Sequence, residues 1–139
     1  MATITATKIT ESGIASSMTT CATGAGGDEF VNTGQEFIRV QNTHASATYT
    51  VKVQVQKSTV EHPVYGSLTK GNIYKSVSSP GSSGANSMLL GPFKQGSFNN
   101  TSNKVKVFYK AGTGLTDAAF DALTDIAGAH LLKIEVLYL

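Results

Sequence analysis

The sequence predicts a mainly β protein: an antiparallel β-sandwich of jelly-roll-like topology, with one short helix near residues 116–127. Charged residues make up only 14 % of the chain, against roughly a quarter in an average soluble protein, and Thr, Ser, Gly and Asn take their place. Several segments alternate apolar and polar side chains with a period of two, which is typical of strands with one buried face. The 139 residues suffice for one core, so we expect a single β domain over residues 1–139.

Residues 1–12 begin the chain with an extended pattern. Ile4 and Ile9 stand among threonines, whose branched side chains favour extended backbone. We expect this segment to be an N-terminal arm that adds a strand to a neighbouring chain, or an edge strand of its own sheet. The small residues that follow, 16–27, predict one short strand and a turn.

Seven segments further along the chain have strand patterns. Residues 48–56 are the clearest, with Tyr and Val on one face and Thr, Lys and Gln on the other. Pro92 has no backbone N–H, so its strand should end there or lie at an edge. Residues 57–91 are otherwise rich in turn-forming residues, and we expect mainly loops there with short strands between them. The expected strands are residues 30–31, 37–40, 48–56, 72–77, 88–93, 104–110 and 131–139.

One segment carries helix signals. Thr116 is a suitable N-cap, and Leu115 and Phe120 are placed to form a hydrophobic staple. Gly128 is a suitable stop just after the helix. The apolar positions at helical spacing are Phe120, Leu123 and Ile126, and the expected solvent-facing positions are Asp117, Asp121 and Asp125.

The histidines and the cysteine do not form a pattern that carries chemistry. His44, His62 and His130 lack the spacing of a metal site or of an HExxH motif. Cys21 has no neighbouring His to activate it as a nucleophile. The GAGGD of residues 24–28 lacks the ending of a phosphate-binding loop. We therefore expect a protein that is not an enzyme, with no catalytic residues, no bound metal and no cofactor.

Charge and hydropathy argue against two classes of partner. The net charge is +2, Arg39 is the only arginine, and the lysines are spread along the chain, whereas nucleic-acid-binding proteins cluster Lys and Arg on one face. No apolar run approaches the ~18 residues of a membrane-spanning helix. Residues 1–11 do not have the basic and apolar regions of a signal peptide. We expect no nucleic-acid partner and no membrane partner.

A series of short motifs resembles the small structural proteins of tailed bacteriophages. The first motif, at residues 27–42, reads GDEFVNTGQEFIRVQN, and a TYTV strand follows at residues 48–51. Residues 90–93, LGPF, are similar to a later G-P-F motif of these proteins, and residues 97–100, SFNN, to the Y-N after it. Residues 105–109 then match a V-x-V-x-Y strand. No single motif is specific, but all of them occur in the expected order.

The resemblance implies a capsid decoration (cement) protein. Such proteins look like β-sandwich or jelly-roll-like units, typically trimers seated on the shell where capsomers meet. The chain is then expected to form a homotrimer, made in the host cytoplasm, that binds the major capsid protein on the capsid surface of the virion. Residues 112–128 are an addition to this pattern and are expected to pack at a subunit boundary or to mark a different subfamily. The candidate assembly contacts are Ile4, Thr5, Thr7, Ile9, Phe93, Phe98, Leu137 and Leu139.

Two other roles stay open on the sequence alone. One is another structural position in the virion, such as a head–tail adaptor or a tail-fibre element, which would differ in its symmetry. The other is a carbohydrate-binding β-sandwich, although the chain has no Trp to stack on a sugar ring.

Overall fold

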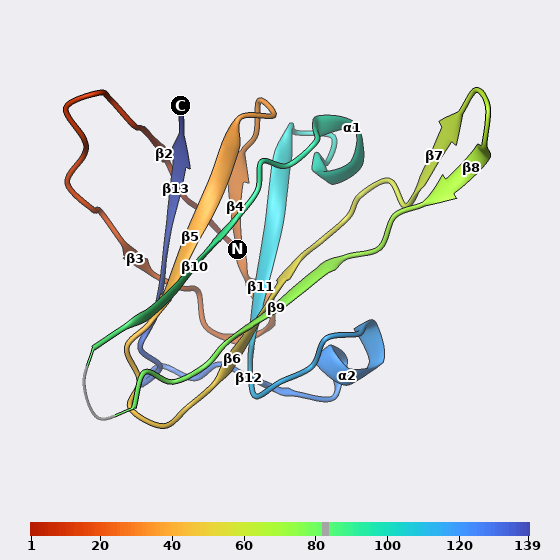
Figure 1. Cartoon of the computed structure of the whole chain (residues 1–139). Coiled ribbons are helices and arrows are strands. Elements are labelled where there is room, and N and C mark those ends of the chain that lie inside the picture. Colours follow the sequence, from red (N-terminus) through yellow and green to blue (C-terminus); the bar gives the residue numbers. More distant parts are fainter. Residues whose placement is uncertain (82–83) are drawn as a thin grey trace.

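Two β-sheets face each other and hold the core between them (Figure 1). The computed structural model describes residues 1–81 and 84–139, without the side chains of Val60 and His62. The predicted mainly β sandwich is confirmed, and its jelly-roll-like topology stays a prediction. Residues 82 and 83 of the expected loop region lie outside the described residues.

The first sheet has β11 at its centre, with β4 and β12 on one side of it and β6 on the other. Its strands, in order across the sheet, are β1 (Ala2–Thr3), β4 (Asp28–Val31), β11 (Lys104–Ala111), β6 (Tyr49–Val53) and β9 (Ile73–Val77), with β12 (Thr124–Asp125) paired to β11.

The second sheet is built around β13. Its strands, in order, are β10 (Asn86–Leu90), β5 (Glu36–Asn42), β13 (Leu132–Tyr138) and β2 (Ala6–Lys8), with β3 (Thr19–Thr20) also paired to β13. A separate hairpin consists of β7 (Thr59–His62) and β8 (Gly66–Thr69). The helical elements are a 3₁₀ turn (Gly24–Gly26), α1 (Gln95–Phe98) and α2 (Asp117–Asp121).

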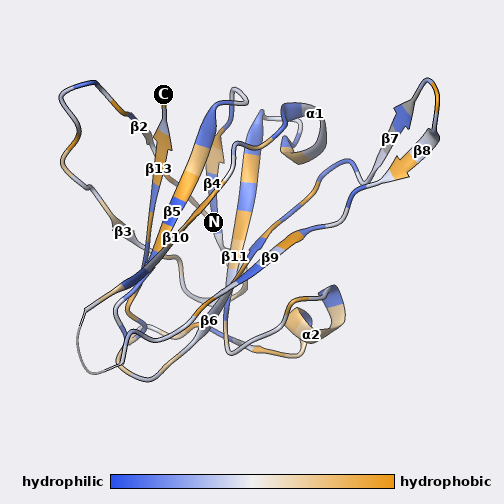
Figure 2. Ribbon diagram, in the orientation of Figure 1, coloured by the Kyte–Doolittle hydropathy of each residue, from blue (hydrophilic) through white to orange (hydrophobic). Residues whose placement is uncertain are grey.

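The strands form where the sequence alternates, because one face of each is buried in the core. In β11 the side chains of Val105, Val107 and Tyr109 are buried, while those between them are partly exposed. Figure 2 shows this alternation of apolar and polar residues along β5 and β11. Strand β6 departs from it at Thr50, which is also buried, since its hydroxyl donates to the carbonyl of Gly112 and accepts from the amide of Gly114.

The N-terminal segment joins the free edges of both sheets. Strand β1 pairs in parallel with β4 of the first sheet, and β2 pairs in parallel with β13 of the second. The other strand pairs are antiparallel, so the sheets are mixed and not purely antiparallel as predicted. Ile4 lies between the two short strands, buried, with its amide donating to Glu29. Of the two expectations for residues 1–12, the structure has edge strands in the chain's own sheets.

The predicted helix is shorter than expected. Thr116 caps α2 by accepting a hydrogen bond from the amide of Ala119, but the helix ends at Asp121. The chain then turns so that Thr124–Asp125 pairs with β11, and Ile126 enters the core. Leu115 is exposed, so the expected staple is absent. Pairing to the free part of β11 and burial of Ile126 override the local helical spacing.

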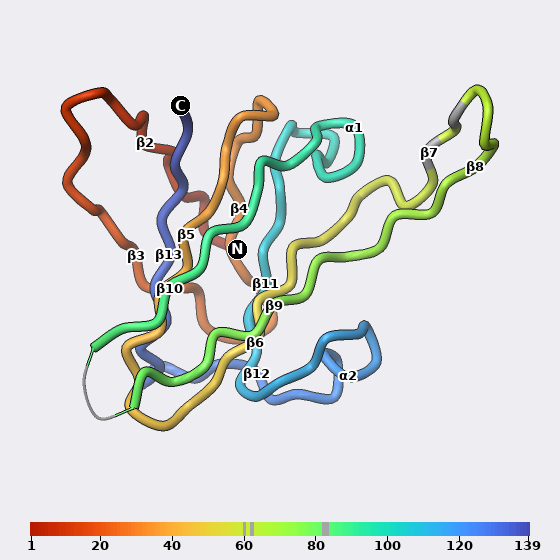
Figure 3. The backbone as a smooth tube through the Cα atoms, in the orientation of Figure 1, coloured from red at the N-terminus to blue at the C-terminus, as the bar shows by residue number. Residues whose placement is uncertain are grey.

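Helix α1 and the hairpin of β7 and β8 were not predicted. Helix α1, a single turn, lies where the sequence suggested only a motif after the G-P-F segment. In the region 57–91, expected to be mainly loop with short strands, the hairpin β7–β8 was not predicted, whereas β9 and β10 correspond to the strands expected at residues 72–77 and 88–93. This hairpin is the most prominent departure from the compact sandwich, and it lies well away from the core (Figure 3).

Candidate functional site

The residues that carry the phage resemblance form the framework of the fold. Gly27 approaches β11 so closely that an added Cβ would lie 2.3 Å from the carbonyl oxygen of Val107. Asp28 is buried and accepts a hydrogen bond from the amide of Ala22. Asn32 is buried too, and its side-chain amide donates to the carbonyl of Phe93 and to Asn99. These motif positions therefore hold the strands and turns in place.

Phe93 and Phe98, two of the candidate assembly contacts, are among those buried in the core. Phe93 and Phe98 are 1 % and 2 % exposed. Their ring centroids lie 5.6 Å apart, and the ring of Phe93 lies 5.8 Å from that of Phe30 on β4. Since these rings pack against one another, Phe93 and Phe98 contribute to the core of the chain, and a contact of either with a partner stays a prediction.

The remaining candidate contacts divide into buried and exposed residues. Ile4 and Leu137 are buried, and Ile9 is half-buried. Thr5 and Thr7 are exposed on the N-terminal segment. Leu139 is 75 % exposed at the end of β13. Thr5, Thr7 and Leu139 therefore keep the accessibility that an assembly contact needs.

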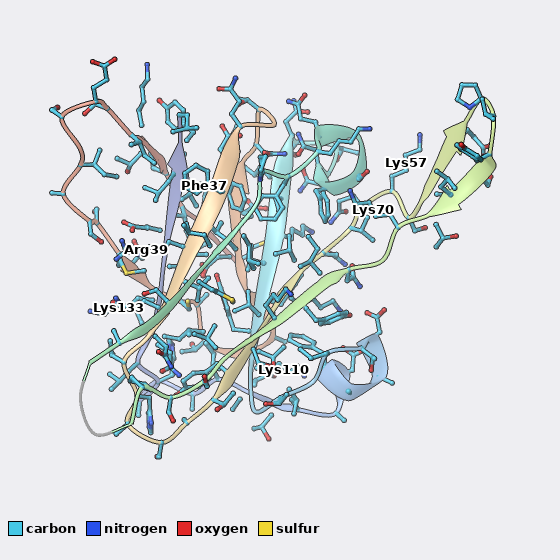
Figure 4. All side chains as sticks on the ribbon, in the orientation of Figure 1. Phe37, Arg39, Lys57, Lys70, Lys110 and Lys133 are labelled. Carbon is cyan, nitrogen blue, oxygen red and sulfur yellow. The ribbon has the colours of Figure 1, made fainter. Side chains whose placement is uncertain are left out.

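The hairpin β7–β8 continues the antiparallel pair β6–β9 beyond the sandwich (Figures 1 and 3). Polar contacts fix the point where the ribbon leaves the body. The amide of Val55 donates to the side-chain oxygen of Asn72, and the amides of Gln56 and Lys57 both donate to the carbonyl of Ser97 in α1. Helix α1 thus supports the base of the hairpin, where Figure 4 labels Lys57 and Lys70.

The tip of the hairpin is apolar and exposed. Val64 and Tyr65 in the turn are 77 % and 74 % exposed, and Leu68 on β8 is also exposed. Every side chain described in residues 58–69 is exposed. Large apolar side chains gathered on a projecting element are typical of a binding surface. We call Val64, Tyr65 and Leu68 the hairpin tip.

An apolar hollow lies at one end of the sandwich, between the start of β5, the residues after β10 and the end of β13. Its volume is about 340 Å³. It is lined by Gly34, Gln35, Phe37, Pro92 and Leu139, of which Figure 4 labels Phe37 on β5. Three separate segments of the chain supply these residues, so no local sequence pattern indicated the site. We call it the end hollow.

A second, polar hollow of about 520 Å³ lies beside α1. Its lining is rich in side-chain amides: Gln56, Lys57, Gln95, Gly96, Asn99, Asn100, Thr101 and Asn103. Part of this polarity serves the fold, because the side-chain oxygen of Asn100 accepts hydrogen bonds from the amides of Ser102 and Lys104. The side-chain amides of Gln56, Gln95 and Asn99 also donate within the chain, to Gln54 and to the carbonyl of Asn32, and their remaining hydrogen-bonding capacity faces the hollow.

Charged side chains pair within the chain on the outer side of the first sheet. Lys52 lies 3.5 Å from Asp117 and 3.8 Å from Asp121, and Lys110 lies 3.4 Å from Asp125. The three aspartates were expected to form a solvated helix face. Asp117 and Asp121 are exposed on α2 as expected and also lie near Lys52, whereas Asp125 lies on β12 and not on the helix.

Tyr74 and Asp117 interact closely next to these ion pairs. The Tyr74 hydroxyl donates to the Asp117 carboxylate. Partial burial and this hydrogen bond raise the pKa of Tyr74 to about 12, and the hydrogen bonds from Tyr74 and Asn72 lower the pKa of Asp117. The ionised Asp117 carboxylate therefore accepts hydrogen bonds from Asn72 and Tyr74 and connects α2 to the first sheet.

Cys21 is buried against β11, where Asp28 and Tyr109 are neighbours. Burial, together with the negative charge of Asp28, raises the pKa of the Cys21 thiol. Burial likewise raises the pKa of Tyr109. A thiol that stays protonated is a poor nucleophile, so the geometry gives this cysteine a packing role.

The described histidines serve local backbone contacts. Nδ1 of His44 accepts from the amides of Ser46 and Ala47, and Nδ1 of His130 accepts from the amide of Leu132. The side chain of His62 lies outside the described residues. In the described part of the chain, no group of three or more His, Cys, Asp or Glu side chains is placed to hold a metal ion. No helix among the described residues is long and apolar enough to cross a membrane.

Comparisons with known proteins give no match. No family model matches the chain, and neither a curated protein nor a solved structure does. The resemblance to phage proteins therefore rests on the motif series alone, and the arguments on function rest on the motifs and on the exposed surfaces.

Proposed function

We propose that the chain is a capsid decoration protein of a tailed bacteriophage, which binds the outside of the head as a homotrimer and stabilises it. The observation that carries the proposal is the ordered motif series between residues 27 and 109. Its residues supply framework contacts, such as the close approach of Gly27 to β11 and the buried hydrogen bonds of Asn32. Motif residues that stabilise the fold, and do not form a catalytic site, are consistent with a protein whose role is structural.

The exposed surfaces support the same role. A decoration protein needs apolar contacts with other copies and with the shell, and the hairpin tip and the end hollow are two such surfaces on the described chain. The low content of charged residues, 14 %, also fits, because interface cores are depleted of charge. Many weak contacts repeated on a lattice bind strongly together.

The direct test is binding to heads that lack their decoration protein. Purified protein is mixed with expanded heads of the phage concerned, and bound protein is separated by sedimentation. We expect saturable binding, copy numbers in multiples of three at each binding position, and a higher melting temperature of the decorated shell. Absence of the protein from the sedimented heads would contradict the proposal, and rings of six or twelve at a single vertex would favour an adaptor.

One observation favours a second candidate, a carbohydrate-binding β-sandwich. The amide-rich hollow beside α1 has a volume of about 520 Å³, which is in the range of small-ligand sites, and amides suit sugar hydroxyls. A glycan array separates the two candidates: hits that disappear in Gln95→Ala would support sugar binding, and an array without hits would remove it. Gly128→Ala, far from this hollow in sequence and with open space around it, is a suitable control.

A further inference from the structure

We infer that a hollow lined by His44 and His130 binds a small neutral ligand of the aromatic carboxamide class, whose polar group both accepts and donates hydrogen bonds. The hollow has a volume of about 310 Å³ and lies at the end of the sandwich where β6 and β13 begin (Figure 1). We call it the histidine hollow. The inference goes beyond the proposed function and does not depend on it.

Two loops bring the histidines together. His44 comes from the loop between β5 and β6, and His130 from the loop between β12 and β13. The amide and the hydroxyl of Thr43 both donate to the carbonyl of Leu131, which ties one loop to the other. Both imidazole rings pack edge-on against the ring of Tyr49, with centroids 6.2 and 6.4 Å from it. The fold itself therefore holds the two side chains at one site.

The walls of the histidine hollow are mainly apolar. Tyr49 and Ile126 are buried beside it. Short side chains from three segments of the chain complete the lining and leave room for a ligand: Ala47, Ala111, Ala127 and Ala129. The volume is at the low end of the range of small-ligand sites, and such a space suits one flat ring with one polar group.

Backbone amides fix the tautomer of both imidazoles. Nδ1 of His44 accepts from the amides of Ser46 and Ala47. Nδ1 of His130 accepts from the amide of Leu132. A neutral imidazole has a single N–H, so each ring carries its proton on Nε2. Neither ring then has a free lone pair for a metal ion, and each presents a hydrogen-bond donor instead.

One of these two donors is buried and has no acceptor. His130 is 7 % exposed, and its Nε2 makes no hydrogen bond with any residue that the structure describes. Buried donors without an acceptor are rare in folded proteins, because each one costs free energy. A ligand oxygen that accepts from this N–H would remove the cost. The unpaired donor therefore points to a ligand and specifies an acceptor on it.

A carboxylate in the same hollow specifies a donor on the ligand. Asp125 on β12 lines the hollow, and its Oδ1 atom is buried and receives no hydrogen bond from the described residues. Lys110, labelled in Figure 4, lies 3.4 Å from this oxygen and balances its charge. An anionic ligand would be repelled by the carboxylate, and a ligand with donors alone would oppose the imidazole N–H groups. A primary carboxamide has an acceptor and a donor on neighbouring atoms, so it satisfies both.

The first experiment compares three ligands of the same shape. Benzamide, benzoate and benzamidinium share a planar ring and differ in the charge and hydrogen bonding of the head group. Each is titrated into the ¹⁵N-labelled protein, and NMR follows the backbone amides of Ala127 and Ala129. We expect saturable shifts with benzamide at a Kd of about 1 mM, and binding of the two ions that is weaker by about tenfold, since each loses a hydrogen bond. Equal binding of the three, or no saturable shift with benzamide, would overturn the inference.

The second experiment uses variants to locate the binding. Ala129 is an exposed residue that lines the hollow, so Ala129→Leu should fill the space and abolish the benzamide shifts. Ala122→Leu makes the same change at an exposed position outside the lining and should keep the wild-type Kd. Asp125→Asn removes the negative charge and should bring the Kd of benzoate close to that of benzamide. Unchanged benzamide binding in Ala129→Leu, or an unchanged preference over benzoate in Asp125→Asn, would contradict the assignment.

A measurement on the wild-type chain tests the donors directly. Long-range ¹H–¹⁵N spectra distinguish the two imidazole tautomers, and at about pH 8, where histidine is ordinarily neutral, His44 and His130 should both carry the proton on Nε2. The Nε2 resonance of His130 should shift as benzamide saturates the site. A proton on Nδ1 of either ring, or a His130 Nε2 that benzamide leaves unchanged, would overturn the inference. None of these results depends on binding to phage heads, so the inference and the proposed function fail separately.

Discussion

Replacing Gly27 by alanine tests whether the motif residues are framework. Gly27 has φ 62° and ψ −167°, a combination that is essentially restricted to glycine and costs other residues about 1–3 kcal/mol. A Cβ there would lie 2.3 Å from the carbonyl oxygen of Val107 and 2.9 Å from the ring of Phe108. The first of these atoms belongs to the backbone of the central strand β11, so it is not free to move aside.

The two effects combine to a large loss of stability. Moving a packed strand to admit an extra methyl group costs about 1–3 kcal/mol, so the conformational and steric costs together give about 2–6 kcal/mol. The unfolding entropy of a chain of this length is about 0.3 kcal/mol/K. The melting temperature of Gly27→Ala should therefore fall by about 7–20 °C.

The assay is thermal and urea unfolding followed by circular dichroism, with Gly128→Ala as the control. Gly128 has no positive φ and nothing within 4 Å of an added Cβ, so alanine there should leave the stability unchanged or raise it by up to about 1 kcal/mol. Equal midpoints for Gly27→Ala and the wild type would refute the account of the motif given above.

Three further predictions concern buried hydrogen bonds and titrating groups. Asn32→Ala removes two donated hydrogen bonds from a buried site and should lower the free energy of unfolding by about 2–3 kcal/mol in urea titrations. Lys104 donates to Glu29 at 2.6 Å and lowers its pKa from 4.5, so this stabilisation is present above about pH 4.5 and is lost as the pH falls through the lowered value. The difference in urea midpoint between the wild type and Lys104→Met should become smaller as the pH falls below about 4.5. A difference that stays constant with pH would contradict the prediction. The pKa of Tyr74 is raised from 10.0 to about 12, so between these pH values the native protein should show less phenolate absorbance than the urea-unfolded chain. The free energy of unfolding should fall over the same pH range. Coincident titration curves of the native and unfolded protein would refute the shift.

Strands were predictable where one face is buried over several residues. In residues 48–56 and 104–110 the alternation of side chains in the sequence corresponds to burial in the structure, because the core accepts only one face of β6 and β11. The end of the helix was not predictable in the same way. Ile126 fits a helical spacing, but it also fits a chain that turns back to pair with β11, and only the tertiary structure decides between them.

The hairpin β7–β8 could not be predicted from the sequence, because its side chains are exposed. The hairpin is solvated on every described side chain, so no buried face imposed a period of two on residues 59–69. The HPVYG turn was the one local signal, and it indicated a turn without showing that strands flank it. Phe93 was placed at the end of an expected strand and Phe98 after it, but no local pattern showed that both rings are buried. Phe93 packs against Phe30, which lies far away in the sequence, and Phe98 packs against Phe93.

The position of β13 at the centre of the second sheet governs the order in which this protein is able to fold. Its neighbours β2 and β5 come from the first third of the chain, so their pairing with β13 waits until residues 132–138 have been synthesised, although β5 is able to pair with β10 earlier. Strand β2 is thus among the last elements to be paired. Folding dominated by contacts so distant in sequence is slow, and an edge that waits for its partner strand is exposed to aggregation meanwhile. A chaperone that binds the nascent chain would protect β2 until residues 132–138 have been synthesised.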